Sequence, residues 1–313
     1  MGGRPRWWKA ESTYTEVKKC IDDMFLLLPT AEVRNIIGAC MGRALAKYPV
    51  KVFWVDANLN HLHRGRAPIK GQEQNMSEFD RYFFSLLTRE INRLMDRRGA
   101  GTIWAGKNRV EECVDDGSIE QQLFYAATNL VKDGQLSSAS QNKGMCSYHA
   151  IASGCFRERF TYVDWTEWFQ AGGKRKKLPV SAFVKNVTVK LSKIPPWENK
   201  SNAECATLFR KGVRALEESF QREREIAGRG VRGDEGLSHL NPRSRPSRRK
   251  ERTPQPLCHA SSAGAAKSYQ VKWKDFLKAY RAASIAYLSG DTDASFPAGS
   301  YKPPRFLMCG NSP

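Results

Sequence analysis

The sequence has no long apolar run. None of its segments approaches the roughly 18 consecutive apolar residues that a membrane-spanning helix needs. The first residues, MGGRPRWWKAE, also lack the apolar stretch of a secretory signal. We therefore expect a cytoplasmic protein with no membrane partner.

Paired cysteine motifs are missing as well. The eight cysteines form no Cys-x-x-Cys pair and no finger-like spacing, so nothing supports a zinc ribbon or a dithiol redox motif. Cys40 and Cys113 lie within apolar patterns. Buried, reduced thiols are the expected state.

Acidic residues are in the minority. The 313 residues include 51 Lys and Arg against 32 Asp and Glu, for a net charge of +19. Such an excess is typical of proteins that bind a polyanion. Nucleic acid is the leading partner and would make the protein nucleoid-associated, while an anionic membrane surface is the rival.

The first half of the chain alternates strand and helix patterns. Apolar spacing, β-branched runs and helix caps predict a strand at 14–20, a helix opened by Pro29-Thr30, strands at 50–55 and near 62–67, a helix capped by Ser77, a strand at 102–114 and a helix beginning at Ser118. The order strand, helix, strand, strand, helix, strand is the split βαβ arrangement. The expected fold is therefore α+β, with a ferredoxin-like antiparallel sheet and packed helices.

The sequence of the second half of the chain predicts a mostly helical and basic extension. We expect a first domain over 13–165, a charged helical extension over 166–227, a disordered basic linker over 228–256, and an amphipathic helix with a Pro-rich tail over 257–313. A basic cluster, residues 174–177, precedes a strand-like stretch near 179–191.

Two of the five histidines, His61 and His63, stand one residue apart after the run VFWV. On a strand both would point to one face, with Leu62 turned into the core. Two converging imidazoles leave room for a divalent ion. Spacing alone leaves metal binding and a structural role equally open.

The helix predicted from Ser118 carries Tyr125 on its polar side. Its apolar side holds Ile119, Leu123, Ala126, Ala127 and Leu130. Asn129 follows Tyr125 by one turn, and Lys132 shares the polar side. A phenol, an amide and a cation on one helix face could serve phosphate chemistry.

These motifs resemble those of single-tyrosine HUH transposases, in particular their REP-associated group. The matching stretches are Asn60-His61-Leu62-His63, Gly101-Thr102-Ile103-Trp104-Ala105-Gly106-Lys107, Tyr125-x-x-x-Asn129-Leu130-Val131-Lys132-Asp133-Gly134 and Cys146-Ser147-Tyr148-His149-Ala150. They cover roughly residues 13–155 in the family's order. The resemblance implies an HUH endonuclease core that cleaves and rejoins single-stranded or hairpin DNA.

Carried over by position, the resemblance makes His61 and His63 metal ligands and Tyr125 the nucleophile. Asn129 takes the position of a third ligand. Neutral ligands leave the full charge of Mg²⁺ or Mn²⁺ to act on the scissile phosphate, and attack by the phenol would give a 5′-phosphotyrosine and a free 3′-hydroxyl. Candidate DNA contacts are Trp104, Lys107, Arg109 and Lys132, with core packing as the competing interpretation of Trp104.

One departure from the family follows the second histidine, where Arg64-Gly65-Arg66 replaces an apolar strand. It predicts a poorly formed third strand. The alternatives are a catalytically degenerate or host-recruited DNA- or RNA-binding protein on the same fold, or a metal-dependent hydrolase that uses the His-x-His pair. A homodimer is a further option that the sequence leaves open.

Overall fold

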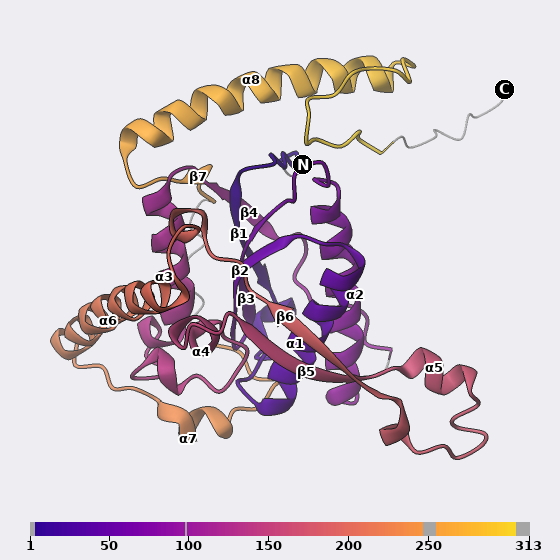
Figure 1. Cartoon of the computed structure of the whole chain (residues 1–313), viewed down its shortest axis with the longest axis vertical. Helices are drawn as coiled ribbons and strands as arrows, with labels where there is room; N and C mark the ends of the chain where they lie inside the picture. Colours follow the sequence, from indigo (N-terminus) through magenta and orange to yellow (C-terminus); the bar gives the residue numbers. More distant parts are fainter. Residues whose placement is uncertain (1–3, 98, 247–254, 305–313) are drawn as a thin grey trace.

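The computed structural model describes residues 4–97, 99–246 and 255–304 (Figure 1). Its first half contains β1 (Thr13–Lys19), α1 (Ala31–Lys47), β2 (Lys51–Asn58), β3 (His61–Ala67), α2 (Asn75–Leu94), β4 (Arg109–Cys113) and α3 (Asp116–Lys132). The second half contains α4 (Tyr148–Ala152), β5 (Arg157–Val163), α5 (Trp165–Gln170), β6 (Val184–Lys190), α6 (Asn202–Ile226), α7 (Gly233–Ser238), β7 (Cys258–His259) and α8 (Ala263–Leu288). Short 3₁₀ helices span Ile21–Asp23, Ala139–Gln141, Val180–Phe183 and Pro195–Trp197.

The main sheet has the strand order β2-β3-β1-β4-β7. Its first four strands pair antiparallel, and only the two-residue β7 runs parallel to β4. Because β1 lies between β3 and β4, the two βαβ halves interleave. The predicted α+β fold with a ferredoxin-like antiparallel sheet is confirmed.

Two helix layers cover the sheet. On one face α1 and α2 bury Ile37, Met41 and Phe83 together with Leu62 of β3. On the other face α3 lies on the sheet and α6 packs outside it, where the rings of Phe124 and Phe209 lie 6.2 Å apart. Figure 1 shows α2 and α3 on opposite sides of the strands. Within the described residues no helix combines the length and apolarity required to cross a membrane.

A second, two-stranded sheet crosses the predicted boundary at residue 165. β5 and β6 pair antiparallel from Arg157↔Lys190 to Val163↔Val184. The ribbon packs on α1 at Gly38 and Gly42, where an added Cβ would lie 2.4 Å from the Phe160 ring and 2.4 Å from Val187. The first predicted domain and the start of the helical extension are therefore joined by strand pairing.

Several predicted boundaries were wrong. Ser77 lies inside α2, which begins at Asn75, and α3 is capped by Asp115 in a capping box with Ser118 rather than by Ser118 itself. The strand predicted at 102–114 shrinks to Arg109–Cys113, because Trp104 joins Cys20 through a single bridge and the chain then turns. Helix α7 lies within the predicted disordered linker, whereas residues 247–254 of that linker lie outside the described residues.

Candidate functional site

The two histidines of β3 point to the face of the sheet that α3 covers. His61 pairs with Asn58 of β2 and Lys19 of β1, and His63 pairs with Asp56 and Val17. The rings of His61 and His63 lie 4.8 Å apart, edge to face. Leu62 between them is fully buried against α1 and α2, as the alternation of a strand predicts.

Helix α3 brings Tyr125 and Asn129 to these histidines. The capping box at Asp115 fixes where the helix starts, and burial of Ile119, Leu123, Ala126, Ala127 and Leu130 holds the helix between the sheet and α6. The Tyr125 ring centroid lies 5.9 Å from that of His63, and Asn129 Nδ2 lies 3.3 Å from His63 Nε2. Lys132 Nζ stands 4.7 Å above the Tyr125 ring.

Burial controls the charge of His63. The ring is 6% exposed, and desolvation followed by the neighbouring His61 lowers its pKa well below the ordinary value. A neutral imidazole also fits its neighbour, because the Asn129 amide can donate only to a ring nitrogen that carries a lone pair. His63 is thus held in the form that ligates metals.

The Nδ1 nitrogen of His61 holds the ring in its orientation. Its Nδ1 lies 2.8 Å from Asn60 Oδ1, and the Asn60 amide donates to the Asp23 carbonyl at 3.3 Å. An amide oxygen only accepts, so in this contact His61 Nδ1 carries the proton and donates it. This is the arrangement that orients histidine ligands in metal sites.

The donor set fits a divalent cation that accepts nitrogen and oxygen. His61 and His63 supply two imidazole nitrogens, and Asn129 supplies an amide, whose oxygen is a ligand for Mn²⁺ or Mg²⁺. Across residues 4–97, 99–246 and 255–304, no group of three or more His, Cys, Asp or Glu side chains gathers as a metal site. The hydrolase hypothesis therefore finds no cluster of three or more such ligands in that part of the chain.

Three polar residues beside the histidines were missed from the sequence. Asp56 and Asn58 lie opposite His63 and His61 in β2, and Lys19 lies opposite His61 in β1. Asp56 Oδ2 and Asn58 Nδ2 are buried without a hydrogen-bond partner, and burial raises the pKa of Asp56 to about 7. The alternation in Val55-Asp56-Ala57-Asn58 was the available signal, since polar residues recurred at every second position of a strand.

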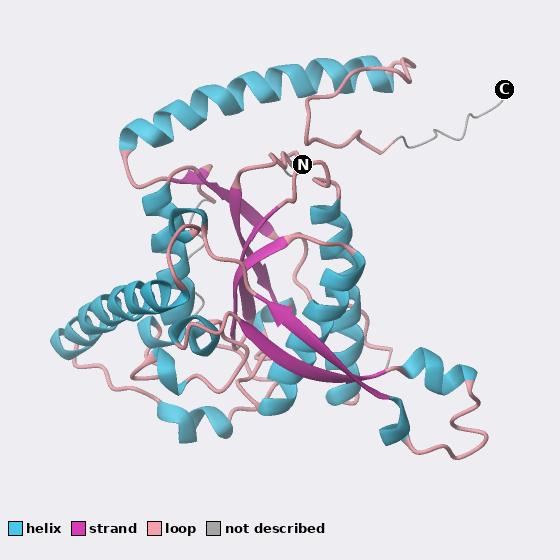
Figure 2. Ribbon diagram, in the orientation of Figure 1, coloured by secondary structure: helices cyan, strands magenta, loops and turns pink. Residues whose placement is uncertain are grey.

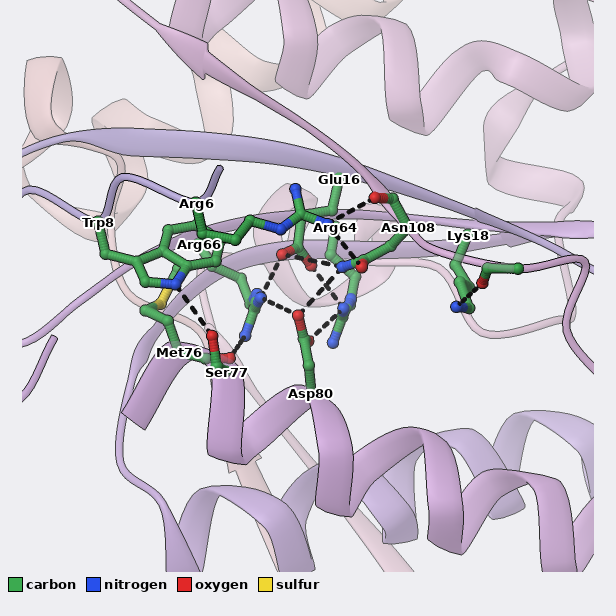
Figure 3. Close-up of polar contacts among 11 residues, drawn as sticks. Arg6, Trp8, Glu16, Lys18, Arg64, Arg66, Met76, Ser77, Asp80 and Asn108 are labelled. Carbon is green, nitrogen blue, oxygen red and sulfur yellow. Dashed lines mark hydrogen bonds and ion pairs between the residues drawn. The ribbon is translucent and has the colours of Figure 1, made fainter. Parts of the chain in front are cut away.

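The prediction that Arg64-Gly65-Arg66 would weaken the third strand was wrong. β3 extends through Ala67 and pairs with both β1 and β2. Arg64 and Arg66 project to the face opposite the histidines, where both form ion pairs with Glu16 of β1 and Asp80 of α2 (Figure 3). Two buried cations meet two carboxylates, so the strand tolerates them.

Gly65 has its own reason to stand between the arginines. A Cβ at this position would lie 2.3 Å from the Trp54 indole. The Trp54 ring is fully buried on the histidine side of the sheet. The motif therefore places charges on one face of β3 and leaves space for an aromatic ring on the other.

The four predicted DNA contacts lie in three different surroundings. Lys132 is at the site, and Arg109 occupies the cross-strand row of His63 and Val17, two strands away on the same face. Lys107 is exposed in the turn before β4. Trp104 is 6% exposed and packs edge to face on Phe84 of α2, with centroids 5.0 Å apart, so the structure places it in the core on the opposite face.

Among solved structures, the chain is similar to a REP-associated tyrosine transposase bound to a REP hairpin. The TM-score is 0.41 and the identity 14%, over 49% of this chain and 86% of that one. No protein-family profile and no curated protein matches the sequence.

Proposed function

We propose that the protein is an HUH-type tyrosine nuclease and strand transferase that acts on single-stranded or hairpin DNA. One observation carries the proposal: β3 and α3 bring His61, His63, Tyr125 and Asn129 together at a single place. The Tyr125 ring centroid lies 5.9 Å from that of His63, and the Asn129 amide contacts His63 directly. A nucleophile beside a set of neutral metal ligands is what strand cleavage requires.

In the proposed reaction the Tyr125 phenolic oxygen attacks the scissile phosphorus. A bond forms between phosphorus and the tyrosine oxygen, and the bond between phosphorus and the 3′ oxygen breaks. The phenol loses its proton, and the departing 3′ oxygen gains one to become a hydroxyl. A bound Mg²⁺ or Mn²⁺ would supply charge that polarises the phosphate. The Lys132 ammonium, placed over the Tyr125 ring, offsets charge that develops on the phosphoryl oxygens.

Rejoining is the reverse attack by a 3′-hydroxyl on the phosphotyrosine. The ester bond is conserved through both steps, so no nucleotide cofactor is needed. Asn60 acts as a positioning residue, since its side-chain oxygen lies against the Nδ1 nitrogen of His61.

The test is formation of a covalent protein–DNA adduct. Full-length protein is incubated with Mn²⁺ and single-stranded oligonucleotides from the DNA flanking its gene, and adducts are resolved on denaturing gels. Tyr125→Phe should abolish the adduct, whereas Tyr148→Phe, on the neighbouring α4, should retain it. His61→Ala, His63→Ala and chelation should each reduce it by at least about 100-fold. An adduct that survives Tyr125→Phe would remove the assignment.

A second candidate is a non-catalytic nucleic-acid-binding protein on the same fold. It is favoured by one contact: the buried Asn129 amide and His63 ring satisfy each other without a metal. This candidate predicts DNA binding that is unchanged by His61→Ala and by chelation, with no strand cleavage.

A further inference from the structure

The basic cluster predicted at residues 174–177 lies at the end of an arm. The arm is the β5–β6 ribbon with α5 and the connection between them, residues 157–190. Its base packs on α1, which covers the sheet face opposite α3. Figures 1 and 2 show the ribbon extending beyond the helices and ending in α5 and its loop. We call residues 164–185, at the end of the arm, the tip.

The tip is folded rather than open. The Trp168 indole covers Gly173, where an added Cβ would lie 2.2 Å from the ring, and its Nε1 donates to the Leu178 carbonyl at 3.1 Å. Backbone bonds from Gly173 to Trp168 and from Leu178 to Gly173 close the same loop. Arg93 of α2 stacks over Trp165 with 4.3 Å between the guanidinium and the ring centroid. The loop therefore presents a defined surface.

That surface is cationic and carries an exposed aromatic ring. Lys174, Arg175, Lys176 and Lys177 are all exposed, and within the described ranges none of their side chains forms a salt bridge. The two acidic residues of the tip, Asp164 and Glu167, are both paired with Lys185. Phe169 is 61% exposed, and its ring lies 4.8 Å from that of Trp168.

We infer that the tip is a second nucleic-acid contact, which binds a single strand through its phosphates and one stacked base. Four exposed cations on a short loop can neutralise several neighbouring phosphates of one strand. An exposed phenyl ring beside them is a stacking platform that any unpaired base can use. A duplex would engage the charges but not the ring, since its bases are already stacked.

This contact lies outside the proposed cleavage site and does not depend on it. The arm packs on α1, whereas Tyr125, His61 and His63 lie between the sheet and α3. A strand held at the tip would be tethered to the protein at a point separate from the reacting phosphate.

Fluorescence anisotropy with labelled (dT)₂₀ tests the inference. All proteins carry Tyr125→Phe and are measured in EDTA, so the result is independent of whether cleavage occurs. Replacing Lys174, Arg175, Lys176 and Lys177 by Gln should weaken binding at least about tenfold at 100 mM NaCl and reduce the salt slope by about 3. Phe169→Ala should weaken (dT)₂₀ binding at least about fivefold and leave binding to a 20-base-pair duplex unchanged.

A charge-matched control is available on α8. Lys272, Lys274, Lys278 and Arg281 are also exposed, and changing these four to Gln alters the net charge equally. If this control weakens binding as much as the tip variant, only net charge matters and the inference fails. An unchanged (dT)₂₀ affinity in Phe169→Ala would overturn the single-strand assignment. The variant with Gln at 174–177 is also tested on phosphatidylserine vesicles. If it loses vesicle binding but keeps its DNA affinity, the tip binds an anionic membrane and the inference fails.

Discussion

At the scale of single residues, the two faces of β3 carry different chemistry. His61 and His63 face α3 and the candidate nucleophile, while Arg64 and Arg66 face α2 in a buried ion-pair network. Neighbouring residues of a strand point to opposite faces, so a one-residue slip of register would exchange the two sets. The network is therefore expected to hold the histidines in place as well as to stabilise the sheet.

Glu16→Gln tests this network. Glu16 is 1% exposed and accepts from both buried guanidinium groups. Losing its charge leaves two buried cations with Asp80 alone, so the free energy of unfolding should fall by about 3–5 kcal/mol. Urea denaturation followed by circular dichroism measures it.

The matched control is Glu78→Gln. Glu78 pairs with Arg81 on the exposed side of α2, so its loss should cost less than about 1 kcal/mol. Equal costs for the two variants would contradict a structural role for the buried network.

The sequence predicted which side chains are buried where the periodicity of a single helix or strand determines it. Alternation alone put Leu62 in the core, and helical periodicity alone put Ile119 and Leu123 there. Asp56, Asn58 and Lys19 were missed, because their proximity to the histidines depends on strand register, which links distant segments. The burial of Arg64 and Arg66 was missed for the same reason: their partners lie on β1 and α2.

At the scale of elements, glycines in α1 decide where the β5–β6 arm packs. Gly38→Ala would place a methyl group 2.4 Å from the Phe160 ring. The overpacking should destabilise the protein by about 1–3 kcal/mol, despite the better helix propensity of alanine. Thermal unfolding by calorimetry measures the change.

Gly264→Ala in α8 is the control for that substitution. Nothing lies within 4 Å of a Cβ built at Gly264, so this change should be neutral or stabilising by up to about 1 kcal/mol. If Gly38→Ala is stabilising to the same extent, the arm does not pack on α1 as described.

The junction of β4 with β7 should make stability depend on pH. Burial raises the pKa of Glu111 to about 6, and its Oε2 lies 4.0 Å from His259 Nε2 of β7. Between pH 4.5 and 6 the folded state holds a proton that the unfolded state has lost, so Glu111 lowers stability as the pH rises through this window. Glu111→Gln removes the effect.

The free energy of unfolding of Glu111→Gln, relative to the unmodified protein, should therefore rise by about 2 kcal/mol from pH 4 to pH 7. Chemical denaturation at each pH measures it. Glu218→Gln, at an exposed position of α6, should show a flat difference. A flat difference for Glu111→Gln as well would contradict the raised pKa.

At the scale of the whole molecule, the order of elements was predictable and the long-range pairing was not. Hydrophobic periodicity predicted the strand and helix order of residues 13–133, which the interleaved sheet confirms. The pairing of β5 with β6 and of β4 with β7 joins segments on either side of predicted domain boundaries. No local pattern contains that information, because each short strand is specified by its partner.

The long helix α8 is linked to the N-terminal segment through aromatic rings. Trp7 stacks on Phe276 with centroids 4.4 Å apart and planes 8° from parallel, and Figure 1 shows α8 crossing one end of the molecule. The two halves of the sequence thus form contacts at α8, at β7 and between α3 and α6. The extension is built onto the sheet-bearing core rather than tethered to it.

We propose that Tyr125 forms a covalent bond to DNA beside His61 and His63. The most direct measurement is mass spectrometry of the protein after incubation with single-stranded flanking DNA and Mn²⁺, followed by nuclease and trypsin digestion. We expect a 5′-phosphonucleotide on the tryptic peptide of residues 110–132, localised to Tyr125 by fragmentation. A nucleotide on another tyrosine, or cleaved DNA with no modified peptide, would contradict it.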